Sequence, residues 1–258
     1  GGRVVITALD PAAPPVFSRV HISDSRNIVF DGVIFDSGRA DRPEYWTDFD
    51  VLHSSGITVK NSVMRSFASE FYKPNAGVDK GHDFMSARHS SSITIENNEI
   101  YGHFDAFTFV DVTGLTFRGN ELRHIQNDGV HGGQWVDAVI EGNRFHSFLG
   151  GDGFYRHSDM IQIWSDDTDG PSRNVAIMDN IFLSNTGISN QTIFIQNKLV
   201  EDDPSLLYEN FRIANNIIYN ASDNGVAIPQ IDGVEIHDNT IIWDQTAFAI
   251  FGDEYKNA

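Results

Sequence analysis

The chain has 258 residues, of which 40% are apolar, and its 18 Lys and Arg stand against 36 Asp and Glu, which gives a net charge of −18. The apolar content suffices for a core and excludes a disordered chain, and the negative charge argues against nucleic acid or an anionic membrane as a partner. There is no cysteine and no apolar run of the roughly 20 residues that a membrane span needs, so disulfides and a membrane partner are not expected.

Taken in order, the chain consists of copies of one short segment, in which two alternating runs flank a polar pair. Two weaker copies come first, NIVFDGVIFDS (27–37) and GITVKNSVMRS (56–66). Six stronger copies follow: SITIENNEIYG (92–102), GLTFRGNELRH (114–124), DAVIEGNRFHS (137–147), NVAIMDNIFLS (174–184), NFRIANNIIYN (210–220) and GVEIHDNTIIW (233–243). The copies span nearly the whole sequence, so we expect one domain, 1–258, excised from a longer secreted chain.

The spacing of the copies predicts the fold. Their aligned asparagines stand at 98, 120, 143, 180, 216 and 239, so the steps are 22, 23, 37, 36 and 23 residues. Apolar residues alternate within each copy, which excludes helical repeats, and the regular leucines of leucine-rich repeats are absent. The sequence therefore predicts an all-β chain, a single-stranded parallel β-helix of about 8–9 turns, with an inward ladder of asparagines at one corner.

A further strand of each turn lies between the copies. It is found in DFDVLH (48–53), DFMSAR (83–88), DAFTFV (105–110), DGVHGG (128–133), DMIQIW (159–164), QTIFIQ (191–196) and NGVAIP (224–229). Positions three and five are expected to face the core, and positions two, four and six to face out. The fourth positions then form an outward column: Val51, Ser86, Thr108, His131, Gln162, Phe194 and Ala227. Polar and aromatic residues are concentrated in its middle turns, which predicts a cleft there.

Aspartates begin most of these strands. Stacked carboxylates repel, so at least some of them must be protonated, paired, hydrogen-bonded to backbone amides or bound to a cation. One interpretation is a structural corner ladder. The other assigns Asp105, Asp128 and Asp159 to general acid and base catalysis, or Asp128 and Asp159 to a Ca²⁺ ion. His131 stands beside them in the outward column and is a candidate for proton transfer.

Aromatic, amide and cationic side chains near these strands are candidates for binding a sugar. Exposed indole faces can stack on sugar rings, and arginine forks bind carboxylates at two points. These candidate substrate-binding residues are Arg88, Gln134, Trp135, Arg156, Gln162 and Trp164. Histidines at 82 and 157 lack the spacing of a zinc site.

The repeats with their asparagines resemble the right-handed parallel β-helix proteins of the pectate-lyase-like superfamily. This superfamily includes polysaccharide lyases, mannuronan C5-epimerases and several glycoside hydrolase families. The segment HSDMIQIW (157–164) is similar to a motif of secreted bacterial β-helix proteins. The resemblance implies a secreted bacterial protein with a polysaccharide partner, Ca²⁺ as a cofactor and no organic cofactor. The sequence gives no indication of oligomeric state.

The resemblance implies, as the leading hypothesis, β-elimination or C5-epimerisation of a uronate. His131 would be the base, Arg88 or a cation at Asp128 and Asp159 would neutralise the sugar carboxylate, and Tyr155 or His157 would be the acid. The Asp-Pro-His motif of alginate epimerases is absent, because Gly-Val separates Asp128 from His131.

Two other functions stay open. A glycoside hydrolase would use two of Asp105, Asp128 and Asp159 as acid and base. A non-catalytic adhesin or tail-fibre-like module would bind glycan through Trp135 and Trp164.

Overall fold

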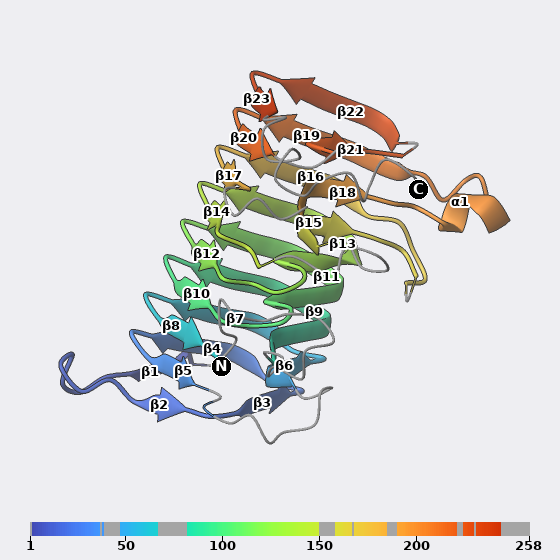
Figure 1. Cartoon of the computed structure of the whole chain (residues 1–258). Coiled ribbons are helices and arrows are strands. Elements are labelled where there is room, and N and C mark those ends of the chain that lie inside the picture. Colours follow the sequence, from blue (N-terminus) through green and yellow to red (C-terminus); the bar gives the residue numbers. More distant parts are fainter. Residues whose placement is uncertain are drawn as a thin grey trace.

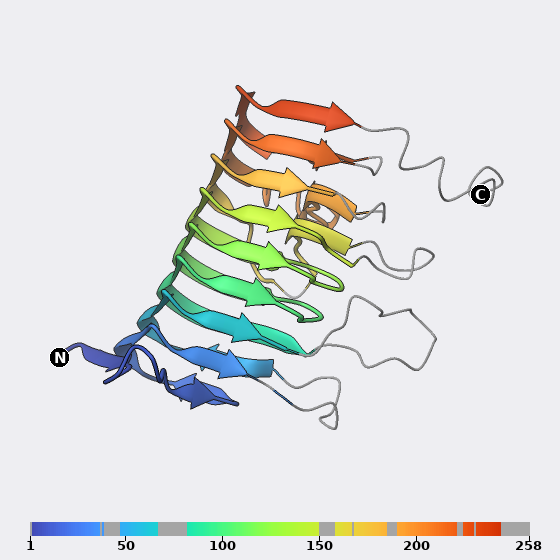
Figure 2. The same cartoon turned by 60° about the vertical axis from the view of Figure 1, so that its left-hand side comes forward.

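The computed structural model describes residues 2–36, 38, 47–66, 82–149, 158–166, 168–184, 190–220, 224–229 and 231–243. Within these ranges the regular secondary structure is β-strand apart from one short helix, α1 (Leu199–Asp202). The strands stack turn upon turn into an elongated solenoid (Figures 1 and 2). No helix in the described ranges is long and apolar enough to cross a membrane.

Two parallel sheets run along the solenoid, and every strand pairing found in the described ranges is parallel. The smaller sheet has nine strands: β2 (Val16–Phe17), β5 (Ile34–Asp36), β8 (Val63–Arg65), β10 (Glu99–Tyr101), β12 (Glu121–Arg123), β14 (Arg144–His146), β17 (Ile181–Leu183), β20 (Ile217–Asn220) and β23 (Thr240–Trp243). Each turn contributes one strand to this sheet, so the expectation of about 8–9 turns is confirmed.

The larger sheet has 14 strands and bends around a corner of the solenoid. Its strands are β1 (Val4–Thr7), β3 (Val20–Ser23), β4 (Arg26–Asp31), β6 (Thr47–Leu52), β7 (Ser55–Lys60), β9 (Asp83–Glu96), β11 (Phe107–Arg118), β13 (Val130–Glu141), β15 (Ser158–Ile163), β16 (Arg173–Met178), β18 (Asn190–Ile195), β19 (Tyr208–Ala214), β21 (Val226–Ala227) and β22 (Ile231–His237). The long strands β9, β11 and β13 pass through the bend, whereas in other turns two shorter strands meet there.

The predicted asparagine ladder is present at the corner between the two sheets. Asn98, Asn120 and Asn143 are at most 4% exposed. The amide oxygen of Asn120 accepts the backbone N–H of Asn98 at 3.0 Å, and that of Asn143 accepts the backbone N–H of Asn120 at 2.9 Å. Each side-chain amide also donates to a carbonyl oxygen one turn earlier. The ladder satisfies backbone groups that the bend removes from the sheet.

The ladder yields a prediction for stability. Asn98→Ala removes the acceptor of the Ser62 N–H and the donor to the Val59 carbonyl, both 3.0 Å away. Since each buried group left unsatisfied costs about 1–3 kcal/mol, the free energy of unfolding should fall by roughly 2–5 kcal/mol. Asn97 is the matched control: it is exposed and has φ of 55°, which glycine adopts freely, so Asn97→Gly should cost about 1 kcal/mol or less. Urea denaturation measures both, and equal losses would contradict a role for the ladder.

Phenylalanines fill the interior. The rings of Phe35 and Phe49 stack at 5.3 Å between centroids, and both contact Phe84, whose ring lies edge-on to Phe107. This column of contacts joins successive turns, so the core is continuous along the solenoid rather than divided between turns.

Three details of the predicted alignment are wrong. Phe84 occupies a second position and Val110 a sixth position, which were expected to face out, but they are 0% and 2% exposed. In β6 the register is shifted by one residue: Asp50, not Val51, pairs with Ser86, and Val51 is buried. Thr47 therefore takes the place opposite Asp83 that the sequence alignment gave to Asp48.

Candidate active site

The outward column lies on the first half of the bent sheet. Pairing in register runs from Asp50 through Ser86, Thr108, His131 and Gln162 to Phe194. These strands are hydrogen-bonded neighbours, so each step is about 4.8 Å. Apart from its first member, the column is the one expected from the sequence.

The aspartates at the start of the strands form a ladder of hydrogen bonds. Asp128 N–H donates to Asp105 Oδ1, and Asp159 N–H donates to Asp128 Oδ1, each at 2.9 Å. Asp105 N–H donates to Asp83 Oδ1 at 3.3 Å. The structural interpretation of this column is therefore confirmed, but each of these bonds uses one carboxylate oxygen and leaves the second for other partners.

His131 lies against the second oxygens of this ladder. Its Nε2 is 3.8 Å from Asp105 Oδ2, and its Nδ1 is 3.8 Å from Asp128 Oδ2. Thr108 Oγ1 forms a hydrogen bond of 2.7 Å with Nε2. The imidazole is 13% exposed, so it is held in place by its neighbours while part of it stays accessible.

Burial sets the protonation of this cluster. It lowers the pKa of His131 below 6.5, an effect that Asp105 opposes and the Arg88 cation reinforces. Burial also raises the pKa of Asp128 well above 3.8, and the charges of Asp105 and Asp159 add to this shift. Around neutral pH the cluster thus combines a neutral imidazole, which can accept a proton, with a carboxyl group that tends to retain one.

The shift at Asp128 predicts how stability depends on pH. Because its pKa is raised on folding, the folded chain holds a proton that the unfolded chain releases near pH 4, so stability falls as the pH rises from there towards the folded pKa. Asp128→Asn keeps an oxygen for the Asp159 N–H but cannot ionise. The variant should be more stable than the wild type at pH 7, with a difference that shrinks towards pH 4. Urea denaturation from pH 4 to 8 measures this, with exposed Asp238→Asn as the control for loss of one charge.

Glycines explain how the turns approach one another beside His131. Gly132 has φ of 140°, and a Cβ there would lie 1.8 Å from the Phe109 carbonyl oxygen of the preceding turn. A Cβ on Gly133 would lie 1.8 Å from the Trp164 carbonyl oxygen of the following turn. The two glycines of HGGQW are therefore required by backbone contact on both sides of β13.

Gln162 and Trp164 lie beside the imidazole, and Arg88 acts on it through its charge. Gln162 is the next member of the column after His131. The Trp164 ring is 6.3 Å from the His131 ring and partly exposed. Arg88 lies on β9, two strands before β13, and its charge acts on His131. The structure thus brings together a candidate base, a cation, an amide and an aromatic face.

Other predicted site residues lie elsewhere or serve the fold. Trp135 is 0% exposed and donates from Nε1 to the Phe109 carbonyl at 2.7 Å, so the prediction that its ring is exposed to a sugar is wrong. It fills the core because it follows the bend of β13. The Gln134 amide donates to Asp111 and accepts the N–H groups of Asp169 and Gly170, which ties the following loop to the sheet. The predictions for three further residues lie outside the described residues: Tyr155, Arg156 and His157.

The Ca²⁺ site expected at Asp128 and Asp159 stays a prediction. Ca²⁺ takes six to eight oxygen ligands, and one oxygen of Asp128 already accepts a backbone N–H. Across the described ranges no group of three or more His, Asp and Glu side chains could hold a metal ion.

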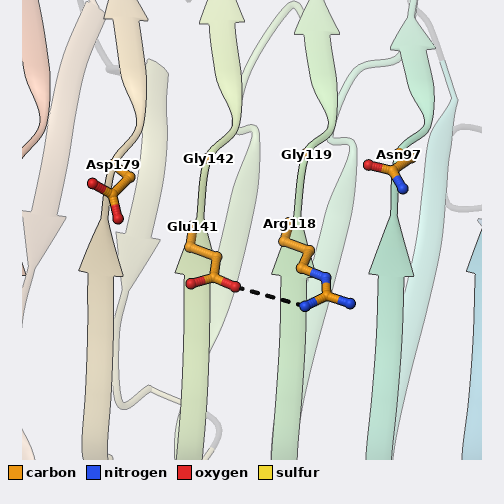
Figure 3. A pocket seen from close by; sticks show the side chains of 6 residues that line it. All are labelled: Asn97, Arg118, Gly119, Glu141, Gly142 and Asp179. Carbon is orange, nitrogen blue, oxygen red and sulfur yellow. Dashed lines mark ion pairs between the residues drawn. The ribbon is translucent and has the colours of Figure 1, made fainter.

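A shallow hollow of about 250 Å³ lies at a different corner, beside the asparagine ladder (Figure 3). It exists because Gly119 and Gly142 carry no side chains between Asn97 and Asp179. Arg118 and Glu141 at its edge approach to 3.9 Å, and Asp179 adds a second carboxylate to its lining. It does not include the His131 cluster.

Two residues near the site had no predicted role. Thr108 appeared in the predicted column without a role, yet it makes the shortest contact to His131. Asp50 was misplaced by the register shift; it lies in the column, 3.7 Å from Arg19, and burial raises its pKa. The only sequence signal for either residue is the alternation of inward and outward side chains along the strands, which places them on the outward face.

The family model of the right-handed β-helix region matches residues 50–257. The chain belongs to this β-helix family. The predicted right-handed parallel β-helix is thereby confirmed. No curated protein sequence matches the chain.

Solved structures similar to this β-helix protein include the periplasmic alginate epimerase AlgG, with 12% identity, a TM-score of 0.49, and coverage of 89% of this chain and 51% of that one. The catalytic domain of a GH87 α-1,3-glucanase has 12% identity, a TM-score of 0.39 and coverage of 94% and 58%. The surface protein and adhesin PfbA of Streptococcus pneumoniae has 13% identity, a TM-score of 0.41 and coverage of 87% and 67%. The chain spans about half the length of the epimerase structure.

Proposed function

We propose that this β-helix protein acts on a uronate-containing polysaccharide, with His131 as the base that removes the proton from C5 of the sugar. The observation that carries the proposal is the environment of His131: burial lowers its pKa, so the ring is neutral near pH 7, and Thr108 and two aspartates fix its position. A neutral, positioned imidazole meets the requirement for a general base.

Arg88 is proposed to pair with the sugar carboxylate. The proton at C5 becomes acidic enough to remove only when the charge on the adjacent carboxylate is neutralised. A guanidinium does this through two parallel hydrogen bonds. Arg88 is partly exposed and lies two strands before β13, in register with Gly133, and its charge acts on His131.

The electrons left at C5 have two outcomes. In elimination they form a double bond between C4 and C5 while the C4–O bond breaks and an acid protonates the leaving oxygen. In epimerisation C5 takes a proton back on its opposite face. Tyr155 and His157 stay the predicted acids. Gln162 and Trp164 are proposed to hold the neighbouring sugar through a hydrogen bond and stacking.

A glycoside hydrolase is the second candidate, because one observation favours it. Asp128 tends to hold a proton, as the acid of a glycosidase must, and the strand carrying Asp105 is the adjacent one, about 4.8 Å away. Such a separation is near the 5–5.5 Å of retaining enzymes. One observation disfavours the hydrolase: the carboxylates of Asp105 and Asp128 each accept a backbone N–H group in the aspartate ladder.

The proposal includes a location outside the cytoplasm, where such polymers occur. The sequence resemblance that suggested a secreted protein supports this.

Incubation with a panel of acidic and neutral polysaccharides, in Ca²⁺ and in EDTA, tests the proposal. Elimination produces an unsaturated sugar that absorbs ultraviolet light, and epimerisation exchanges the C5 proton with D₂O without chain cleavage. New reducing ends without ultraviolet absorbance would replace the proposal with hydrolysis. Glycan binding without any product would indicate a binding module.

A further inference from the structure

A second column of polar side chains follows the bend of the large sheet. Its members are outside the cluster around His131: Asp24, His53, His89, Asp111 and Gln134. All five have left-handed backbone angles, with φ between 48° and 55°. This shared conformation gives each residue the same place in its turn, so the five side chains succeed one another along the corner.

Two imidazoles face each other in this column. The rings of His53 and His89 are 5.4 Å apart between centroids, with an interplanar angle of 25°, and both residues are exposed. They come from neighbouring turns of the solenoid, because the N–H of His53 donates to the Arg88 carbonyl. Exposed side chains of this kind can tilt towards each other without disturbing the core.

Asp111 orients one of the two rings. His89 Nδ1 is 2.8 Å from Asp111 Oδ2, and Asp111 Oδ1 accepts a hydrogen bond from Gln134 Nε2 at 3.1 Å. An ionised carboxylate only accepts hydrogen bonds, so Nδ1 carries the proton and the lone pair of the ring is on Nε2. A carboxylate behind an imidazole is the usual partner of a metal-binding histidine.

The fold does not require histidine at these positions. The corner beside the hollow also has left-handed residues on successive turns, and it uses Asn61, Asn97, Gly119, Gly142 and Asp179. Small residues of these types adopt this conformation readily. The left-handed backbone at the corner therefore does not explain why two adjacent histidines and an orienting carboxylate are present there.

We propose that His53 and His89 form a binding site for a late first-row divalent metal ion, Cu²⁺, Ni²⁺ or Zn²⁺. Imidazole nitrogen suits these ions, whereas Ca²⁺ and Mg²⁺ prefer oxygen. The two rings supply two ligands, water completes the coordination, and Asp111 holds His89 from behind. Along β9 the site is about 20 Å from Asp83, six residues away, so it is separate from the aspartate ladder.

Binding of Cu²⁺ and Ni²⁺ tests the proposal without any activity assay. Titration calorimetry should give one site per chain, and the electron paramagnetic resonance spectrum of bound Cu²⁺ should show coupling to two imidazole nitrogens. His53→Ala and His89→Ala should each weaken binding at least tenfold and leave coupling to one nitrogen. Asp111→Asn should weaken binding several-fold or more, since it alters the orienting bond.

His237→Ala is the matched control. His237 is also exposed, and its Nδ1 lies 2.8 Å from the carboxylate of Asp238. In the described part of the chain, however, no second histidine ring faces it as His53 faces His89. Its loss should leave the affinity unchanged. The proposal is overturned if the double variant of His53 and His89 binds like the wild type, or if His131→Ala removes the site. Circular dichroism confirms that the exposed substitutions leave the fold intact.

Discussion

Replacing His131 with alanine should reduce turnover of the uronate polymer by 10²- to 10⁴-fold, the range that a general base contributes. The imidazole is the neutral group between Asp105 and Asp128 that can take the C5 proton. The loss should appear in kcat more than in KM, because the residues proposed to bind the sugar, Arg88, Gln162 and Trp164, are unchanged. Initial rates of product formation measure it, with exposed His237→Ala as the control.

The pH profile provides an independent readout of the same group. A base must be unprotonated, so activity should be lost as the pH falls through the pKa of His131, which burial places below 6.5. Arg88→Ala removes a cation that depresses this pKa, so the pKa of His131, followed by NMR titration without substrate, should be higher in that variant. Full activity of His131→Ala, with loss in Asp105→Asn and Asp128→Asn, would transfer the chemistry to the carboxylates.

Gly132→Ala should prevent folding or lower the free energy of unfolding by more than about 4 kcal/mol. The added Cβ would lie 1.8 Å from the Phe109 carbonyl oxygen and 2.6 Å from its carbon, so β11 and β13 would have to separate. Backbone atoms cannot move aside as a flexible side chain can. The φ of 140° adds strain, because residues with a Cβ rarely adopt it.

Gly142→Ala is the matched control, because Gly142 directly follows β13, the strand that contains Gly132. Its φ is 64° and a Cβ there meets nothing within 4 Å, so only the left-handed backbone cost of about 1–2 kcal/mol applies. Soluble yield and thermal unfolding compare the two variants. Similar losses in both would show that close approach of the turns at Gly132 does not matter for stability.

The periodic pattern of the chain determined the fold. The spacings of 22, 23, 37, 36 and 23 residues between aligned asparagines are those of the hydrogen-bonded pairs in the ladder from Asn98 to Asn239. A solenoid repeats one local unit, so alternation and spacing specify which residues become neighbours. The same logic placed Thr108, His131 and Gln162 in one column.

Only the tertiary structure decided which of these residues could form a site. Trp135 belongs to the same segment as His131, but the bend of β13 turns its ring into the core, whereas Trp164 stays partly exposed. The sequence could not separate structural from reactive aspartates, because each carboxylate of the ladder has one oxygen for the backbone and one for its surroundings. Protonation depends on burial and on charges contributed by other turns, as at Asp128, and the pairing of His53 with His89 depends on register across 36 residues. These properties arise from distances between strands, which a linear pattern does not contain.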